Sequence, residues 1–306
     1  MFHQILNLLT FFSTLINSYN GISLHHNSEC VYVKSEEDTY RFQSEGYRNI
    51  CGLYVISDPD YLVEFEFEEF DVSCANGGLL SVVDGWELNG QFFPGTEDHL
   101  IPRNQRYQEY CGLHKPWKSF RTSQNVGLIE FRVPVRGQGF TVRVKFVRNP
   151  KPCNTVLQNP QGVYTLRNYG QSINCTISII FPESFRILAL NVGSQSTRTD
   201  DLMAPQMLEV ETGLIKKCKE RGQRDYVEIL GGDGLDPHLM AVAEDFCGTD
   251  SIPNKHKIEV ACGNTAVRLV STGTHDNSVT LAFDLLLDID SPTLLCPQML
   301  ESIAIN

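Results

Sequence analysis

Ten cysteines in 306 residues constrain this chain more than any other feature. They are Cys30, Cys51, Cys74, Cys111, Cys153, Cys175, Cys218, Cys247, Cys262 and Cys296. No two are closer than fifteen positions, so no C-x-x-C motif occurs. This spacing excludes a redox dithiol and the usual zinc-ribbon pattern, and it favours five disulfides in an oxidising compartment.

The N-terminus indicates that compartment. Residues 5–16 form an apolar run, followed at once by the polar and small residues 17–21. The run is too short to span a bilayer as a helix, so residues 1–20 are interpreted as a secretory signal peptide. The lack of Lys or Arg before the run is atypical, and the alternative is a buried N-terminal helix. No later stretch is apolar enough to span a membrane, and we expect a secreted, extracellular protein.

The charge balance limits the partners. The chain has 25 Lys and Arg against 37 Asp and Glu, a net charge of −12. Phosphate binding needs a positive surface, so no nucleic-acid partner is predicted.

The cysteine spacing also shows an internal repeat. A C-x20-C-x22-C-x36-C pattern starts at Cys30, and a C-x21-C-x42-C-x28-C pattern starts at Cys153. The matches extend to the sequence after each fourth cysteine, where Asn125 corresponds to Asn264. So many matches in one order indicate two copies of one module. The predicted domains are residues 30–148 and 153–288.

Spacing alone does not determine which cysteines pair. If both modules use the same bridges, the simplest scheme is sequential, and the two cysteines without a counterpart pair by exclusion. That scheme ties the C-terminal segment, residues 289–306, to the second module. The resulting pairs are Cys30–Cys51, Cys74–Cys111, Cys153–Cys175, Cys218–Cys247 and Cys262–Cys296.

Hydrophobic alternation predicts β-strands throughout. Residues 61–68 alternate polar and apolar over most of their length, and turn signals such as Asn89-Gly90 recur between similar runs. No segment keeps a helical period over twelve residues. The fold class is therefore all-β, with an antiparallel β-sandwich in each module.

Short motifs resemble those of CUB domains. They are Tyr54 and Pro59 after the second cysteine, the strand Phe65-x-Phe67-x-x-Phe70, the stretch 225–229, and the Cys-Gly pair at each fourth cysteine. The resemblance implies two tandem CUB-like β-sandwiches. Sequential pairing of the first four cysteines is typical of that domain.

Longer motifs resemble the corticotropin-releasing factor-binding protein family. They are residues 83–90, 123–126, 152–154, 174–182 and 227–237. The resemblance implies a secreted glycoprotein that sequesters a corticotropin-releasing-factor-like or diuretic-hormone-like peptide and limits receptor activation. The alternative is an extracellular CUB interaction module that assembles with matrix or developmental proteins. The family has an Arg before the first cysteine and an Asp after it, where this chain has His26 and Tyr32, so peptide-binding residues remain unassigned.

Two candidate modification and metal sites follow. Asn174-Cys175-Thr176 is the one N-x-[ST] sequon, so Asn174 is predicted to be glycosylated, the alternative being an unmodified Asn beside a disulfide. Many CUB domains bind calcium through a Glu and two Asp side chains. The second module keeps Asp225 at one such position, whereas the first has Gly78 where that Asp would stand and residues 72–73 where the Glu would fall. Neither module has the complete set, so Asp225 is interpreted as a turn or edge-strand residue, and no metal and no cofactor are predicted.

Three further features of the sequence bear on binding and catalysis. The acidic stretch 64–71 is interpreted as the solvated face of a strand rather than a steering patch. Of the two tryptophans, Trp86 is expected to be packed and Trp117 exposed. No G-x-S-x-G, H-E-x-x-H or phosphate-binding glycine loop occurs, so the protein is not predicted to be an enzyme.

Overall fold

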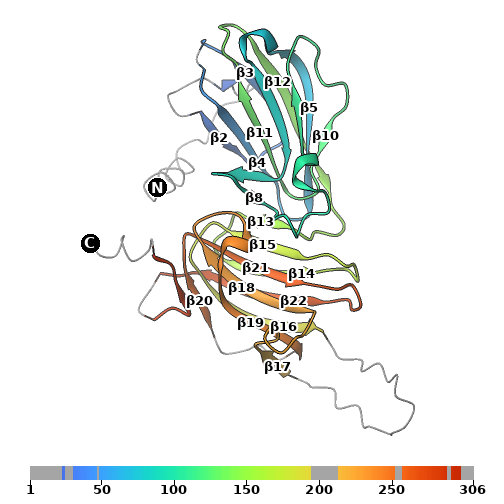
Figure 1. The fold of residues 1–306 in the computed structure, drawn as a ribbon, viewed down its shortest axis with the longest axis vertical. Coiled ribbons are helices and arrows are strands. Elements are labelled where there is room, and N and C mark those ends of the chain that lie inside the picture. The colour runs from blue at the N-terminus through green and yellow to red at the C-terminus, as the bar shows by residue number, and fades with distance from the viewer. Residues whose placement is uncertain are drawn as a thin grey trace.

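The computed structural model describes residues 23–24, 30–46, 48–193, 213–251, 257–287 and 291–297. The predicted signal peptide and His26 lie outside these ranges. The described chain forms two β-sandwich domains stacked end to end (Figure 1), so the all-β, two-domain prediction is confirmed. No helix in the described ranges is long and apolar enough to cross a membrane.

The first domain is a sandwich of two five-stranded sheets. Its strands are β1 (Ser23–Leu24), β2 (Val31–Lys34), β3 (Thr39–Gln43), β4 (Cys51–Ile56), β5 (Tyr61–Asp71), β6 (Leu79–Asp84), β9 (Tyr107–Tyr110), β10 (Phe120–Arg121), β11 (Val126–Arg132) and β12 (Gly139–Arg148). One sheet has the order β1-β3-β12-β5-β10 and the other β2-β4-β11-β6-β9. A single turn of 3₁₀ helix, η1 (Cys74–Asn76), precedes β6.

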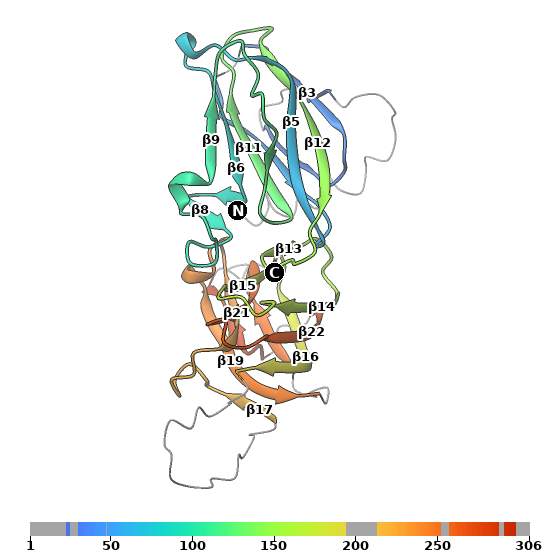
Figure 2. The same cartoon turned by 90° about the vertical axis from the view of Figure 1, so that its right-hand side faces the viewer.

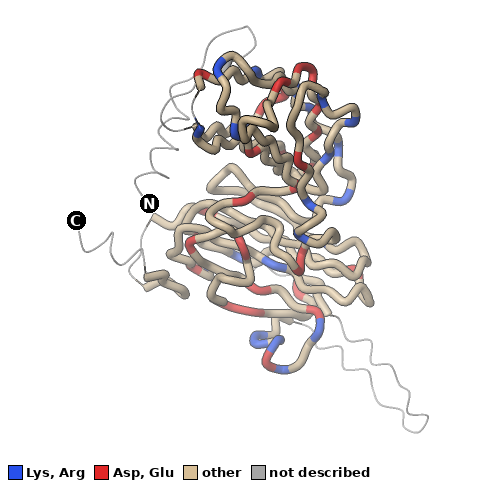
Figure 3. The backbone as a smooth tube through the Cα atoms, turned by 45° about the horizontal axis from the view of Figure 1, so that its top comes forward, with Lys and Arg blue, Asp and Glu red and all other residues tan. Residues whose placement is uncertain are grey.

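The alternation in β5 builds the core between these sheets. Phe65 and Phe67 are buried with side chains from both sheets, as a half-buried strand requires. The carboxylates on the other face form ion pairs with basic residues of neighbouring segments. These pairs are Glu64–Arg121, Glu66–Lys145, Glu68–Arg143 and Glu69–Arg41. Acidic and basic positions are interspersed over both domains (Figure 3), which agrees with a solvated strand face rather than a steering patch.

The second domain repeats this arrangement with one difference. Its strands are β13 (Thr155–Leu157), β14 (Gly162–Arg167), β15 (Cys175–Ile179), β16 (Glu183–Val192), β17 (Gly213–Lys216), β18 (Tyr226–Gly232), β19 (Ala241–Asp250), β20 (Ile258–Ala261), β21 (Asn264–Val270), β22 (Ser278–Leu285) and β23 (Leu294–Leu295). The layer β13-β15-β21-β18 continues through β19 to β16, which also pairs with β20 and β22. Long β19 therefore joins the two layers, and the single 3₁₀ turn η3 (Pro237–Leu239) leads into it.

All ten cysteines are paired in the structure. Each domain has two bridges that join cysteines in sequence order, and a fifth bridge joins Cys262 to Cys296. Beside this fifth bridge, β23 runs parallel to β20, with Leu294 opposite Val260. The disulfide and the added strand together attach residues 291–297 to the second domain.

The strand register changes the alignment of the two modules by one residue. Phe131 of β11 lies opposite Cys51, and Leu269 of β21 lies opposite Cys175. Counting back from these cysteine pairs, Val126 corresponds to Asn264. The match of Asn125 with Asn264 drawn from the sequence is therefore wrong by one position, because aligned asparagines are a weaker marker than pairing with a disulfide.

An insertion in the first domain, residues 85–106, joins the two domains. It contains the hairpin of β7 (Trp86–Leu88) and β8 (Gln91–Phe93), a loop, and the 3₁₀ turn η2 (Arg103–Gln105). Gly85 begins it with φ of 119°, and a Cβ there would lie 2.2 Å from the carbonyl oxygen of Phe93. Only glycine therefore fits where the chain leaves β6. Figure 2 shows the insertion between the two domains.

The joint has an apolar part. Trp86 and Phe93 of the insertion pack in one buried cluster with Val156 and Leu235 of the second domain. Beside them the Asn125 side chain donates to the carbonyl oxygen of Val156 and accepts from its N–H, both at 2.9 Å. Asn125 thus bonds the first strand of the second domain much as a strand neighbour would.

The joint also has a buried charged part. Asp98 at the tip of the insertion is 1% exposed and lies 2.7 Å from the Arg268 guanidinium of β21. Arg268 also pairs with Glu228 of β18 at 2.9 Å, and the Thr176 hydroxyl donates to Asp98 at 2.8 Å. Burial alone would lower the pKa of Arg268, but hydrogen bonds and charge from Asp98 and Glu228 raise it. The guanidinium is therefore held charged between two carboxylates.

We predict that Arg268→Met destabilises the protein. The substitution leaves the Asp98 carboxylate buried without a countercharge and leaves Glu228 paired with Lys219 alone, which costs about 3–5 kcal/mol. Denaturant unfolding measures the loss. The matched control is Lys217→Met, which removes an ion pair whose side chains are 71% and 68% exposed and costs under about 1 kcal/mol. Equal losses in the two variants would contradict the prediction.

A second buried carboxyl, that of Glu183 in β16, makes stability depend on pH. It is fully buried, neither oxygen has a hydrogen-bond partner, and burial together with the charge of Asp284 raises its pKa to about 8. The folded state therefore binds the proton more tightly than the unfolded chain. This contribution is complete at low pH and is lost as the pH rises toward 8.

We predict that Glu183→Met flattens this pH dependence. The apolar side chain has no proton to lose, so the variant gains stability over the wild type as the pH rises from 5 to 8, on the order of 1.4 kcal/mol for each unit of the pKa shift. Denaturant unfolding across that range measures the slope. The exposed control Glu220→Met is expected to keep the wild-type dependence of stability on pH. If Glu183→Met also keeps the wild-type dependence, the prediction is wrong.

Candidate functional site

The first domain carries a groove on the outer face of its β2-β4-β11-β6-β9 sheet. Its volume is about 920 Å³. Three rows of outward side chains form the floor, because residues that lie opposite one another in adjacent strands share a face. They are Val83 with Tyr107, then Glu130 with Ser81 and Glu109, then Arg132 with Leu79.

The insertion forms one wall of this groove. Glu87 and Phe92 come from the β7–β8 hairpin, and Arg103 comes from η2. The Arg103 guanidinium lies 4.0 Å from the centre of the Phe92 ring, a cation–π contact that covers the aromatic face. The groove thus combines apolar surface with charged groups of both signs.

Two carboxyls, those of Glu87 and Glu130, line the groove together. Burial, together with a hydrogen bond to Glu87 and its negative charge, raises the pKa of Glu130 to about 7. Arg132 donates instead to the Gly77 carbonyl oxygen at 2.7 Å. Among the described residues, no Lys or Arg forms an ion pair with Glu87, Glu109 or Glu130. The carboxyls of the groove are open to a cationic ligand.

The structure places the aromatic residues singled out in the sequence away from this groove. Tyr32 lies in β2 and packs against the first domain's core. Trp86 is 6% exposed in the joint, where its indole N–H donates to the Val55 carbonyl oxygen at 3.2 Å. Trp117 is 85% exposed, with Lys118 over its ring, next to the ion pairs of the other sheet. Trp86 is therefore packed and Trp117 exposed, as expected.

The positions considered for calcium have structural roles. Asp225 is buried at the start of β18 and accepts from the Thr272 N–H at 2.7 Å and from the Asn277 amide at 3.0 Å. A Cβ at Gly78 would lie 2.8 Å from the Ser73 carbonyl oxygen, so the position has no room for a ligating side chain. In the described ranges no three His, Cys, Asp or Glu are grouped to hold a metal ion.

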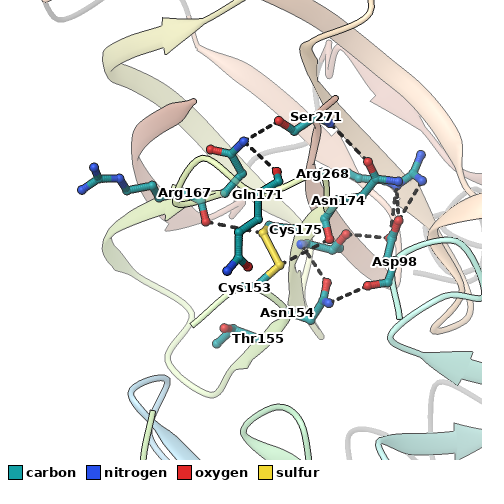
Figure 4. Close-up of a disulfide and its surroundings, with 12 residues drawn as sticks. Asp98, Cys153, Asn154, Thr155, Arg167, Gln171, Asn174, Cys175, Arg268 and Ser271 are labelled. Atoms are coloured by element: carbon teal, nitrogen blue, oxygen red, sulfur yellow. Dashed lines mark hydrogen bonds and ion pairs between the residues drawn. A yellow bond between two sulfur atoms is a disulfide. The ribbon is translucent and has the colours of Figure 1, made fainter. Parts of the chain in front are cut away.

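The sequon lies at the edge of the joint. Figure 4 shows Asn174 beside the Cys153–Cys175 bridge and near Asp98. The Asn174 amide donates to the Glu97 carbonyl oxygen at 3.4 Å and accepts from the Ser271 N–H at 3.2 Å. Asn174 is half-buried, and its glycosylation remains a prediction.

One cluster contains the residue types of a hydrolytic triad. His99 Nε2 lies 3.0 Å from the Ser123 hydroxyl and 3.1 Å from Asp84, while its Nδ1 accepts from the Ile101 N–H. A triad needs one ring nitrogen for the serine and the other for the carboxylate. Here both contact the same nitrogen, so the cluster cannot relay a proton as a triad does. Burial would raise the pKa of Asp84, but hydrogen bonds from His99 and Ser123 lower it.

The fold and the groove define a class of protein. It is a protein of two tandem, disulfide-bonded β-sandwiches whose first domain has a groove lined by apolar side chains and carboxyls. The rows of the sheet and the hairpin that walls it were not found from the sequence. The family motif at residues 83–90 was the one sequence signal that included part of this wall, since it contains Glu87.

Comparison with known families and proteins identifies the family. The family model described as the corticotropin-releasing factor binding protein N-terminal domain matches residues 23–148, and that of the C-terminal domain matches residues 155–291. Corticotropin-releasing factor-binding protein of Ovis aries and that of Homo sapiens are each 35% identical over 254 residues, which cover 83% of this chain and 74% of theirs. The chain belongs to the corticotropin-releasing factor-binding protein family.

Two further matches complete the comparison. The Xenopus laevis corticotropin-releasing factor-binding protein is 33% identical over 257 residues, which cover 84% of this chain and 76% of the relative. The solved CUB1-EGF-CUB2 domains of rat MASP-1 align with 83% of this chain and 99% of that chain at 13% identity, with a TM-score of 0.28. That score is too low to support a conclusion. The family is named for binding and is not an enzyme family.

We predict that Glu87→Gln lowers the pKa of Glu130. The substitution removes the neighbouring negative charge, while the burial that contributes most to the raised value remains, so the pKa falls part of the way from about 7 toward its ordinary value. Carboxyl ¹³C shifts followed by NMR during a pH titration measure it. The control Glu109→Gln changes a carboxyl at the exposed side of the groove. An unchanged titration of Glu130 in Glu87→Gln would contradict the influence of Glu87 on the Glu130 pKa.

Proposed function

We propose that the protein binds a corticotropin-releasing-factor-like or diuretic-hormone-like peptide in the groove of the first domain. The observation that carries the proposal is the groove itself, with its apolar floor around Val83 and Tyr107 and its wall at Phe92. An amphipathic peptide helix docks by laying its apolar face into such a groove. Membership of a family named for binding this peptide class supports the choice of ligand.

The rigid joint suits this role. The insertion that walls the groove is also fixed to the second domain by Asp98 and by the Trp86 cluster. A preformed wall has little conformational freedom to lose when a ligand binds, which favours affinity. We propose that a secreted, glycosylated form of the protein sequesters the peptide and so limits activation of its receptor.

We predict that Leu79→Ala and Tyr107→Ala each weaken peptide binding at least tenfold. Both side chains line the groove and are about 40% exposed, so truncation removes contact surface while leaving the core intact. Isothermal titration calorimetry with the source organism's peptides of both types measures affinity. The control Trp117→Ala removes a more exposed aromatic residue on the other sheet and is expected to change affinity less than twofold.

Two outcomes would contradict the proposal. Absence of binding to all of the peptides at micromolar concentration would exclude the ligand class. Binding that Trp117→Ala weakens and the two groove variants do not would place the ligand on the other sheet. The receptor claim is tested separately, by adding excess protein to receptor-bearing cells and measuring the peptide's dose response.

A further inference from the structure

The strand register identifies equivalent rows of side chains in the two domains. In the first domain the row directly after Cys51 contains Gly52, Glu130, Ser81 and Glu109 in neighbouring strands. In the second domain the row directly after Cys175 contains Thr176, Arg268, Glu228 and Asp245. Glu130 of β11 therefore occupies the position that Arg268 occupies in β21.

The row of the second domain is occupied in the structure. The insertion of the first domain lies on this outer face and places the Asp98 carboxylate on the Arg268 guanidinium, at 2.7 Å, and on the Thr176 hydroxyl. The Glu97 carbonyl oxygen and the Asn174 amide add a contact at the edge. The molecule thus contains an example of a segment docked on this face, anchored at the central position of the row by the buried Asp98 carboxylate, with the exposed Glu97 carboxylate 3.4 Å from the same guanidinium.

The row of the first domain is open and has the opposite charge at its centre. Glu130 and Glu109 lie in the floor of the groove and Glu87 in its wall. None of these three carboxyls has a Lys or Arg partner among the described residues. The apolar residues beside them, Val83 and Leu79, flank the row on both sides along β6.

We propose that the peptide in this groove is anchored by one Lys or Arg side chain placed between Glu130 and Glu87, the charge-inverted counterpart of Asp98 on Arg268. The inference rests on the proposed function and adds the chemistry by which the ligand is recognised. Apolar side chains before and after the basic residue contact Val83 and Leu79, so the recognised segment is a basic residue flanked by apolar ones on one face of a helix.

The position of the two carboxyls supports this assignment. Glu130 and Glu87 line the same groove without a Lys or Arg partner among the described residues, and burial, together with the hydrogen bond and negative charge of Glu87, raises the pKa of Glu130 to about 7. An ammonium or guanidinium placed between them supplies a countercharge and stabilises both ionised forms. The other charged groups lining the groove are Arg103, Arg132 and Glu109, of which Arg103 is stacked on Phe92 and Arg132 donates to Gly77.

A double-mutant cycle tests the anchor. Each Lys and Arg of a peptide that binds the wild-type protein is replaced in turn by norleucine, which keeps the apolar stem and removes the charge. Titrations use the full secreted chain and its Glu130→Gln variant, whose side chain keeps the shape of the protonated carboxyl. One replacement is expected to weaken binding to the wild type at least tenfold and binding to Glu130→Gln less than threefold.

Charge reversal gives a second, independent readout. Glu130→Arg reproduces the central residue of the second domain's row. A second peptide is made in which Glu replaces the basic anchor residue. The Glu130→Arg protein is expected to bind this peptide more tightly than it binds the unmodified peptide. The matched control is Glu69→Gln, an exposed carboxyl on the other sheet that pairs with Arg41. It is expected to leave every affinity within twofold of the wild type.

The outcomes separate the inference from the proposed function. If no peptide binds the wild-type chain, the proposed function fails. If peptides bind, but every norleucine replacement has the same effect on the wild type and on Glu130→Gln, the anchor is wrong while the function stands. If Glu130→Arg does not fold, the double-mutant cycle with Glu130→Gln still tests the anchor by itself.

Discussion

The contact between Asp98 and Arg268 is the interaction on which the rest of the structure depends. It joins a loop of one domain to a central strand of the other in a place that water does not reach. A charge buried there is tolerated only with its partner in place, so the two domains have one favoured orientation. The Asn125 hydrogen bonds to Val156 and the Trp86 cluster reinforce that orientation with uncharged groups.

The insertion connects this joint to the groove. At Asp98 the insertion is fixed to the second domain. At Glu87 and Phe92 it forms the wall of the groove in the first domain. A ligand in the groove therefore meets a wall that the second domain holds in place. Under the proposed function, the second domain supports the groove even though its own equivalent face is covered.

The outer faces of the two modules differ in charge and in what covers them. The modules share a fold, yet the same row of the sheet has Glu130 at its centre in one and Arg268 in the other. In the second domain the short turn η3 stands where the first domain has its long insertion, so the outer face is free to receive Asp98. One face is therefore an internal contact and the other is open.

Much of the fold could be predicted from local patterns. Alternation in residues 61–68 predicted β5 because burial of every second side chain is a property of the strand itself. The cysteine spacing predicted the repeat because a disulfide holds equivalent positions in both copies. The alignment of Asn125 with Asn264 was wrong by one residue, which hid the correspondence of Glu130 with Arg268.

The sequence by itself determined the two β-sandwich modules, since these depend on periodicity and on repeated cysteines. Only the tertiary structure decided where the groove lies, that Trp86 belongs to a joint shared by two domains, and that Ser123, His99 and Asp84 form no triad. These features join residues that are distant in the chain, from Asp98 to Arg268 above all, and no local period records which distant side chains will meet.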